Sequence, residues 1–290
     1  MSIRKQSIKR GNCWKLWGWN WTVNQEQKRH QPSEFSAGDR LEHSIYETLK
    51  VTEKGIELPL IHWERMKNGG QILGIQVPKY PEWIERLRKY LENTACKAPF
   101  ALRVSLSQAR KEFSLNDQSP HWSFSWREIP YTAEQYRKGV RIIFLEEIRQ
   151  DRFPLTTIKS PDYLNTGPAL KELEARDAFE GLWCNPRGEV VEGTRSNVFF
   201  VRDGTICTPP ASSGCLAGTR RRIVKDLALK LNIPFRDKEV FMEDLLQAEE
   251  VFLTNALMGI MPVSQVENTP VSRSIFDGIT AALIQSYKEI

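Results

Sequence analysis

The chain has 290 residues, of which 40% are hydrophobic, and a formal net charge of +5. This length allows one large domain or two moderate ones, and so small a charge excess gives no general argument for nucleic-acid binding. Five cysteines without a CxxC pair and four histidines without ligand spacing argue against a disulfide framework and against a metal site. We therefore expect reduced thiols and a cytoplasmic location.

The same reading predicts no membrane partner. The longest apolar stretch, residues 251–263, is broken by Thr254 and Asn255 and is too short to span a bilayer. The basic N-terminus has neither a continuous apolar run nor a small-residue cleavage site, so we expect no secretory signal.

Residues 1–38 are irregular, basic and rich in tryptophan. Trp17, Trp19 and Trp21 alternate as they would on one face of a strand. Such a strand could stack the bases of single-stranded nucleic acid, but an edge strand that buries one aromatic face is commoner. Nucleic acid is therefore not the expected partner.

Residues 1–127 are expected to form a smaller N-terminal α/β domain. Its predicted elements are a hairpin over residues 44–58, a helix from Leu60 that carries Arg65, a helix after Pro81 with Trp83 and Leu87 on one face, and a strand over residues 101–107. The hairpin follows from two β-prone runs around Gly55, and the second helix from its apolar spacing. The pattern lapses near Pro130 and Gly139, which predicts a linker over residues 128–138.

Residues 139–290 are expected to form a larger, barrel-like C-terminal domain, which makes the fold class α+β. The predicted elements are a helix from Pro168 to Gly181 with Leu170 and Leu173 facing a core, strands over residues 182–185, 189–192, 198–201 and 205–208, a helix opened by Gly218-Thr219, and an apolar strand over residues 251–253. Proline in a first turn and glycine after a last turn are typical of helices, and the strands are bounded by turn residues.

Lys159 and Glu192 indicate a cofactor. A lysine on a rigid segment can hold an aldehyde cofactor as a Schiff base, and a downstream glutamate can keep the ring nitrogen of pyridoxal phosphate protonated. Residues 155–158 predict a strand-like approach to Lys159, followed by a turn at Ser160-Pro161. Each of the two residues alone is more often an ordinary surface charge.

Several polar residues could complete such a site. The helix start at Gly218-Thr219 offers unpaired N–H groups to a phosphate, and Arg65 can bind a phosphate through two hydrogen bonds at once. Thr254 and Asn255 add small donors after a strand. Tyr163 could bond the phenolic oxygen of the cofactor, although core packing is an equal alternative. Singly, a Gly-Thr helix start is usually only a cap.

Taken together, the chain resembles the fold-type IV pyridoxal-phosphate enzymes, which include branched-chain aminotransferases, D-amino acid aminotransferases and 4-amino-4-deoxychorismate lyases. The resemblance covers residues 39–263. The motifs that carry it are DR at 39–40 with YETL at 46–49, HWERM at 62–66, IKS at 158–160 with YLN at 163–165, EGTRSNVF at 192–199, LAGTR at 216–220, and TNALMGIMPV at 254–263.

The resemblance implies a role for each matching position. Lys159 would be the catalytic lysine that holds pyridoxal 5'-phosphate and moves a proton, and Glu192 would pair with the pyridine nitrogen. The other cofactor contacts implied are Arg65, Gly218, Thr219 and Thr254 or Asn255 at the phosphate, Leu216 on the ring, and Tyr163 at the phenolic oxygen. The family also implies a site between a small and a larger domain, and a homodimer whose partner chain completes the pocket.

The finer identity follows from two stretches. Residues 255–263 most resemble the lyases, and residues 102–105 lack both the Tyr-Ile-Arg-Pro pattern of branched-chain aminotransferases and the Arg-x-His of D-amino acid aminotransferases. We therefore expect a lyase that releases pyruvate from aminodeoxychorismate to give 4-aminobenzoate, a folate precursor. An aminotransferase is the alternative, and a nonenzymatic nucleic-acid-binding scaffold is less favoured.

A small anionic substrate is expected in either enzyme. The residues expected to contact it are Tyr46, Arg103, Arg110, Thr194, Arg195 and Ser196. One departure from the family pattern precedes them, because LEHSI at 41–45 stands where the family has Gly-Asp-Gly.

Overall fold

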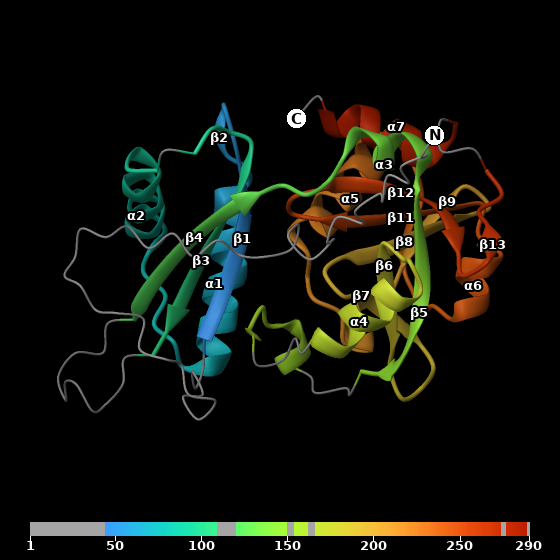
Figure 1. The fold of residues 1–290 in the computed structure, drawn as a ribbon, viewed down its shortest axis with the longest axis horizontal. Coiled ribbons are helices and arrows are strands. Elements are labelled where there is room, and N and C mark those ends of the chain that lie inside the picture. The colour runs from blue at the N-terminus through green and yellow to red at the C-terminus, as the bar shows by residue number, and fades with distance from the viewer. Residues whose placement is uncertain are drawn as a thin grey trace, which may run out of the picture.

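The structure is a computed structural model that describes residues 44–94, 96–108, 120–149, 154–161, 166–273 and 277–288. The tryptophan-rich start, residues 41–43 of the departure at 41–45, and the candidate residues Tyr163 and Arg110 lie outside the described residues. The described chain forms two β-sheets, each with its own helices, and the chain after β4 joins them (Figure 1).

The first sheet has four antiparallel strands in the order β2-β1-β3-β4. Their bounds are β1 Ser44–Thr52, β2 Gly55–Ile56, β3 Phe100–Ser107 and β4 His121–Glu128. The predicted hairpin is β1 with β2, and the predicted strand at 101–107 is β3, so both predictions are confirmed.

One face of this sheet is covered by two helices, α1 Pro59–Leu73 and α2 Tyr80–Glu92. Ile45 and Leu49 of β1 pack with Met66 of α1 and with Trp83 and Leu87 of α2 in a single core. Tyr46 and Thr48, at the alternate positions of β1, are only half-buried, as the period of a strand requires, whereas Glu47 is buried on the same side as Ile45 and Leu49. The sheet therefore has one apolar face and one polar face, and the polar face is free to form the wall of a site.

The predicted linker is partly helical. Residues 133–138 form the helix α3 Ala133–Lys138, and β4 extends to Glu128. Thr132 accepts a hydrogen bond from the backbone N of Gln135, and the Gln135 side chain accepts one from the backbone N of Thr132. This capping box stabilises a helix in a stretch that its short apolar pattern did not reveal.

The second sheet has nine strands in the order β10-β9-β8-β11-β12-β5-β6-β7, with β13 paired to β12. Their bounds are β5 Val140–Ile148, β6 Glu180–Cys184, β7 Val190–Gly193, β8 Asn197–Arg202, β9 Thr205–Thr208, β10 Phe235–Asp237, β11 Glu250–Asn255, β12 Gly259–Val266 and β13 Thr269–Pro270. The strands predicted at 182–185, 189–192, 198–201, 205–208 and 251–253 correspond to β6, β7, β8, β9 and β11.

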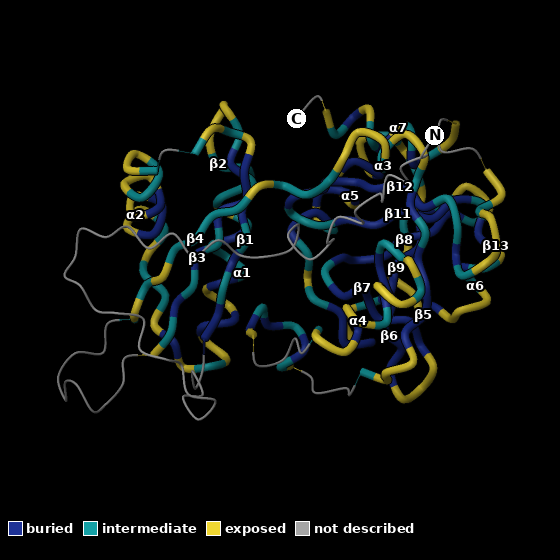
Figure 2. Tube along the Cα trace, in the orientation of Figure 1, coloured by how far each residue is buried: buried dark blue, intermediate teal, exposed yellow. Residues whose placement is uncertain are grey.

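Both faces of this curled sheet are buried, as Figure 2 shows by the dark central strands. Val198 and Phe200 of β8 belong to one core, whereas Phe199 and Val201 belong to the core under the helices α5 Thr219–Lys230 and α7 Ile279–Lys288. The remaining helical elements are α4 Gly167–Ala175, α6 Met242–Leu246, and the 3₁₀ turns η2 Leu155–Thr157 and η4 Ala211–Ser213. None of the helices among the described residues is long and apolar enough to cross a membrane.

Three local predictions were wrong. Leu170 of α4, which was expected to face a core, is exposed. The helix after Pro168 ends at Ala175, and Gly181 lies in β6, where a Cβ atom would clash with Leu145. Packing, and not a helix cap, explains that glycine. The approach to Lys159 is the 3₁₀ turn η2, in which the Thr157 N donates to the Pro154 carbonyl at 3.0 Å.

Candidate active site

A cavity of about 330 Å³ lies between the polar face of the first sheet and one end of the second sheet. Its wall contains every candidate residue that the structure describes. These are Lys159, Arg65, Glu192, Leu216, Gly218, Thr219, Thr254, Asn255, Tyr46, Arg103, Thr194, Arg195 and Ser196. Residues separated by up to about two hundred positions in sequence thus meet at one place, although their chemical roles remain predictions.

Lys159 is anchored to the first sheet. The Tyr46 N of β1 donates to the Lys159 carbonyl at 2.9 Å, and Ile158 is buried in the core beneath that sheet. The Lys159 Nζ lies 4.9 Å from the centre of the Tyr46 ring, and the Arg103 guanidinium lies 3.8 Å from the same centre. The aromatic ring attracts both cations and so fixes where the amine of Lys159 lies.

Glu192 is a buried carboxylate at the end of β7, and each of its two oxygens accepts hydrogen bonds from different donors. Its Oε1 accepts from the Arg149 Nη1, and its Oε2 accepts from the Leu216 N at 2.9 Å and from the Asn197 Nδ2 at 3.4 Å. The carboxylate is therefore fixed in the cavity wall. Arg149 also lies over the Trp183 ring. The sequence analysis missed it because it lies 43 positions before Glu192 in the sequence, and no local pattern connects the two residues.

The start of α5 is shaped to meet a ligand. Gly218 is the N-cap, and a Cβ atom there would overlap the Oδ1 of Asn197, so only glycine allows this close approach. The first N–H groups of a helix have no acceptor within the helix, and the helix dipole favours an anion beside them. Thr219, the first residue of α5, is buried in the same wall.

Thr254 and Asn255 differ in what they can offer. The Thr254 hydroxyl is buried and has no hydrogen-bond partner among the described residues. The Asn255 Oδ1, in contrast, accepts from the N atoms of Leu257 and Met258 at 2.9 Å, and its Nδ2 donates to the Tyr131 hydroxyl at 2.8 Å. Asn255 thus holds the turn after β11, and Thr254 is the better donor for a bound anion.

Arg65 joins the two halves of the cavity. Its Nε and Nη2 donate to the two oxygens of Glu47 at 2.7 and 2.6 Å, and its Nη1 donates to the Ala217 carbonyl at 3.2 Å, just before α5. Burial alone would raise the pKa of Glu47, but Arg65 and His62 lower it to about 2. Burial lowers the pKa of His62, and its Nδ1 lies 2.6 Å from the Glu47 Oε2, the carboxylate oxygen to which it donates.

Sequence reasoning missed Glu47, although a signal existed. The apolar residues Ile45 and Leu49 flank it at a spacing of two, which places the carboxylate on the buried face of β1. A glutamate on such a face requires a buried cation or donor to compensate it.

Two of the expected substrate residues are engaged by the protein itself. The hydroxyls of Thr194 and Ser196 both donate to Glu180, the latter at 2.8 Å, and the Thr194 N donates to the same carboxylate at 3.0 Å. Glu180 is fully buried, so these hydroxyls shape the turn between β7 and β8. Arg195, from the same turn, donates from its Nη2 to the Phe179 carbonyl at 2.8 Å.

The wall also contains residues that the sequence reading did not single out, namely Thr48, Arg127 and Tyr131. Burial lowers the pKa of the Arg127 guanidinium and raises that of Tyr131. Arg127 can be recognised as a cavity residue only once β3 and β4 are known to pair, because that pairing puts Arg103 and Arg127 on one face of the sheet.

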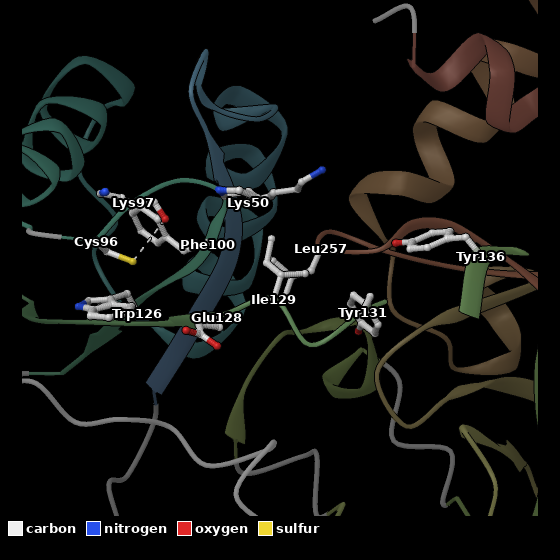
Figure 3. A pocket seen from close by; sticks show the side chains of 11 residues that line it. Lys50, Cys96, Lys97, Phe100, Trp126, Glu128, Ile129, Tyr131, Tyr136 and Leu257 are labelled. Carbon is white, nitrogen blue, oxygen red and sulfur yellow. Dashed lines mark hydrogen bonds between the residues drawn. The ribbon is translucent and has the colours of Figure 1, made fainter. Parts of the chain in front are cut away.

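A second cavity, of about 600 Å³, lies next to the first (Figure 3). Tyr131 and Leu257 line both cavities, so they form the boundary between them. The described residues contain no group of three or more histidine, cysteine or acidic side chains that could hold a metal ion.

A model of the family described as amino-transferase class IV matches residues 44–266, and the chain belongs to that family. The members are pyridoxal-phosphate enzymes, so pyridoxal 5'-phosphate is the cofactor of this chain. The cavity fits this cofactor on two observations: the orphaned hydroxyl of Thr254 beside the start of α5 suits a phosphate, and the fixed carboxylate of Glu192 suits a protonated ring nitrogen.

Both aminotransferases and a lyase resemble the chain. D-alanine aminotransferase of Staphylococcus epidermidis is 26% identical over 275 residues, covering 92% of this chain and 96% of that protein. Aminodeoxychorismate lyase of Bacillus subtilis is 25% identical over 234 residues, covering 72% and 80%. The structure of a Legionella pneumophila protein provisionally named a 4-amino-4-deoxychorismate lyase has a TM-score of 0.77 and 24% identity, covering 86% of this chain and 91% of that one, which confirms the fold.

From the ion pair between Glu47 and Arg65 we predict that the stability of the protein depends on pH. A carboxyl whose pKa falls from 4.5 to about 2 on folding stabilises the protein above pH 4.5, and this contribution is lost as the pH falls towards 2. Glu47→Gln leaves the Arg65 cation buried without its partner, so we expect the free energy of unfolding to fall by about 3 kcal/mol at pH 7.

Urea denaturation between pH 3 and pH 7 measures both effects. The variant should lose less stability than the wild type as the pH falls, because it lacks the titrating group. Glu82→Gln, which removes an exposed carboxylate paired with Arg86, is the control and should change little. Equal behaviour of the two variants would contradict the assignment.

Proposed function

We propose that the protein is a 4-amino-4-deoxychorismate lyase, which releases pyruvate and leaves 4-aminobenzoate. The observation that carries the proposal is the polar, cationic wall opposite the cofactor contacts. Tyr46, Thr48, Arg103 and Arg127 project from the first sheet into the cavity. Such a wall suits an anionic substrate and would be a poor site for the aliphatic side chain of a branched-chain amino acid.

The cofactor, when bound, withdraws electrons from the carbon next to the substrate nitrogen. Lys159 supplies the group that moves the proton at that carbon, because its Nζ lies at the Tyr46 ring in the cavity wall. Glu192 would pair with the ring nitrogen, and Arg149 and the Leu216 N hold its oxygens in place. The N-terminus of α5 and the Thr254 hydroxyl would hold the phosphate, and Arg65 binds the chain just before α5.

An aminotransferase is the second candidate, because the Staphylococcus epidermidis D-alanine aminotransferase matches almost the whole chain. The same Lys159 would then move a proton at the α-carbon of an amino acid, and a keto acid would leave. We further propose a homodimer, as the family resemblance implies, and a cytoplasmic location, in keeping with the free thiols of Cys96, Cys184, Cys207 and Cys215.

The lyase assay tests the proposed activity. Incubating the cofactor-loaded protein with aminodeoxychorismate should give 4-aminobenzoate and pyruvate in equal amounts. Lys159→Ala should abolish the products and change the visible absorption of the bound cofactor, whereas Lys225→Ala, at an exposed position on α5, should alter neither. No 4-aminobenzoate, with keto acids formed from a panel of L- and D-amino acids, would overturn the lyase in favour of the aminotransferase.

The Thr254 hydroxyl, which has no hydrogen-bond partner among the described residues, leads to a separate prediction for cofactor affinity. Thr254→Val preserves the shape of the side chain and removes a buried donor that the protein itself does not satisfy. We expect the apoprotein to be as stable as the wild type or more so, and the dissociation constant for pyridoxal phosphate to rise about tenfold. Fluorescence titration and thermal melts measure the two quantities; a destabilised apoprotein with unchanged affinity would contradict the role.

A further inference from the structure

Arg220 lies in the first turn of α5, one residue after Thr219, and its side chain is almost fully buried, at 1% exposure. A buried guanidinium is costly unless an anion and further acceptors compensate its charge. Its Nη2 donates to the Glu57 Oε2 and, at 3.0 Å, to the Ala256 carbonyl. Arg220 therefore connects three segments, which are the start of α5, the chain just before α1 and the turn after β11.

Glu57 is held in place by both halves of the protein. Its backbone N donates to the Lys50 carbonyl of β1 at 2.9 Å, and its Oε1 lies 3.1 Å from the Lys50 Nζ. The Tyr287 hydroxyl of α7 donates to the Glu57 Oε2 at 3.5 Å, and the Tyr287 ring centre lies 5.6 Å from the Arg220 guanidinium. The Glu57 carboxylate is therefore a fixed acceptor for Arg220.

Two arginines join the halves in opposite directions. Arg65 extends from α1 to the chain just before α5, whereas Arg220 extends from α5 to Glu57, just before α1. Leu58 and Ile61 pack against the core under α5 and α7, so the boundary between these contacts is apolar. One contact alone would allow the start of α5 to turn about it, and two separate contacts prevent this.

The contacts of Arg220 act on both sides of the proposed phosphate site. Thr219 precedes Arg220 in α5, and Ala256 follows Thr254 by two positions, and all four residues line the cavity. The N–H groups of a helix start bind an anion when they point at it, and the effect of the helix dipole is confined to the first turn. A shift of the α5 start relative to Thr254 should therefore weaken binding of a phosphate more than binding of a ring.

We propose that Glu57 and Arg220 are positioning residues for the cofactor phosphate. Their ion pair holds the start of α5 against the turn that carries Thr254, so that the donors of both segments point at one anion. This inference rests on the phosphate contacts of the proposed function, and it holds for a lyase and for an aminotransferase alike.

A comparison of pyridoxal phosphate with pyridoxal isolates the phosphate, because the two molecules share the ring and the aldehyde. Visible absorption titrations of the apoprotein give a dissociation constant for each. We expect the wild type to bind pyridoxal phosphate at least about a hundredfold more tightly. Glu57→Gln keeps the size of the side chain and removes its charge, so it should weaken binding of pyridoxal phosphate about tenfold and that of pyridoxal less than about twofold.

Glu57→Asp is the second variant, because it keeps the charge and shortens the side chain. It should give an intermediate loss for pyridoxal phosphate. The matched control is Glu64→Gln, which removes the exposed carboxylate that pairs with Arg222 between the same two helices. It should change neither dissociation constant.

Thermal melts establish which variants are folded, and the aspartate variant keeps the test valid if the glutamine variant is not. A merely structural role would raise both dissociation constants by the same factor. That result, unchanged constants in the folded Glu57 variants, or equal affinity of the wild type for the two ligands would overturn the proposal.

The outcomes also separate this inference from the proposed function. A phosphate preference that Glu57→Gln lowers, in a protein that forms no 4-aminobenzoate, would retain the positioning role and reject the lyase. A phosphate preference that Thr254→Val lowers and the Glu57 variants keep would retain the proposed phosphate contacts and reject the positioning role.

Discussion

The interaction on which the site depends is the one between Glu47 and Arg65. It is buried on the helix-covered side of the first sheet, yet Arg65 extends to the Ala217 carbonyl immediately before α5. The same carboxylate accepts from His62, so Glu47, itself held by His62, fixes the guanidinium. This guanidinium is one of the contacts that join the half that carries Lys159 to the start of α5, which we propose faces the phosphate.

Three proposed tasks in the cavity fall to residues that are each held by a contact with a neighbouring element. Lys159 is tied to β1 through the Tyr46 N, Glu192 is tied to the loop before α5 through the Leu216 N, and Gly218 is packed against Asn197. Apart from Lys159 and Arg65, the proposed cofactor contacts that the structure describes lie in the half formed by the second sheet, and the first sheet supplies the polar wall. Members of the family with different activities can therefore share the cofactor contacts and differ in the wall, which is where we assign substrate choice.

The sequence predicted most elements and most of the site, because helix caps, alternating strands and the family motifs are local patterns. Lys159, Glu192 and Thr254 could be named from such patterns. Arg149, Glu180 and Arg127 could not, because their importance depends on which strands pair, and pairing is set by packing over long separations. The same reason explains why the hydrogen bonds of the Thr194 and Ser196 hydroxyls were not foreseen: a motif gives their position in the turn, whereas only the fold places Glu180 beneath them.

The central claim is that the cavity between the two sheets binds pyridoxal phosphate through Lys159. Borohydride reduction of the cofactor-loaded protein, followed by proteolysis and mass spectrometry, tests it directly, because reduction makes the link between the lysine and the cofactor permanent. The account predicts a phosphopyridoxyl group on the peptide that contains Lys159, in about one copy per chain. Modification of a different lysine, or none at Lys159 in a protein that retains its visible absorption, would contradict it.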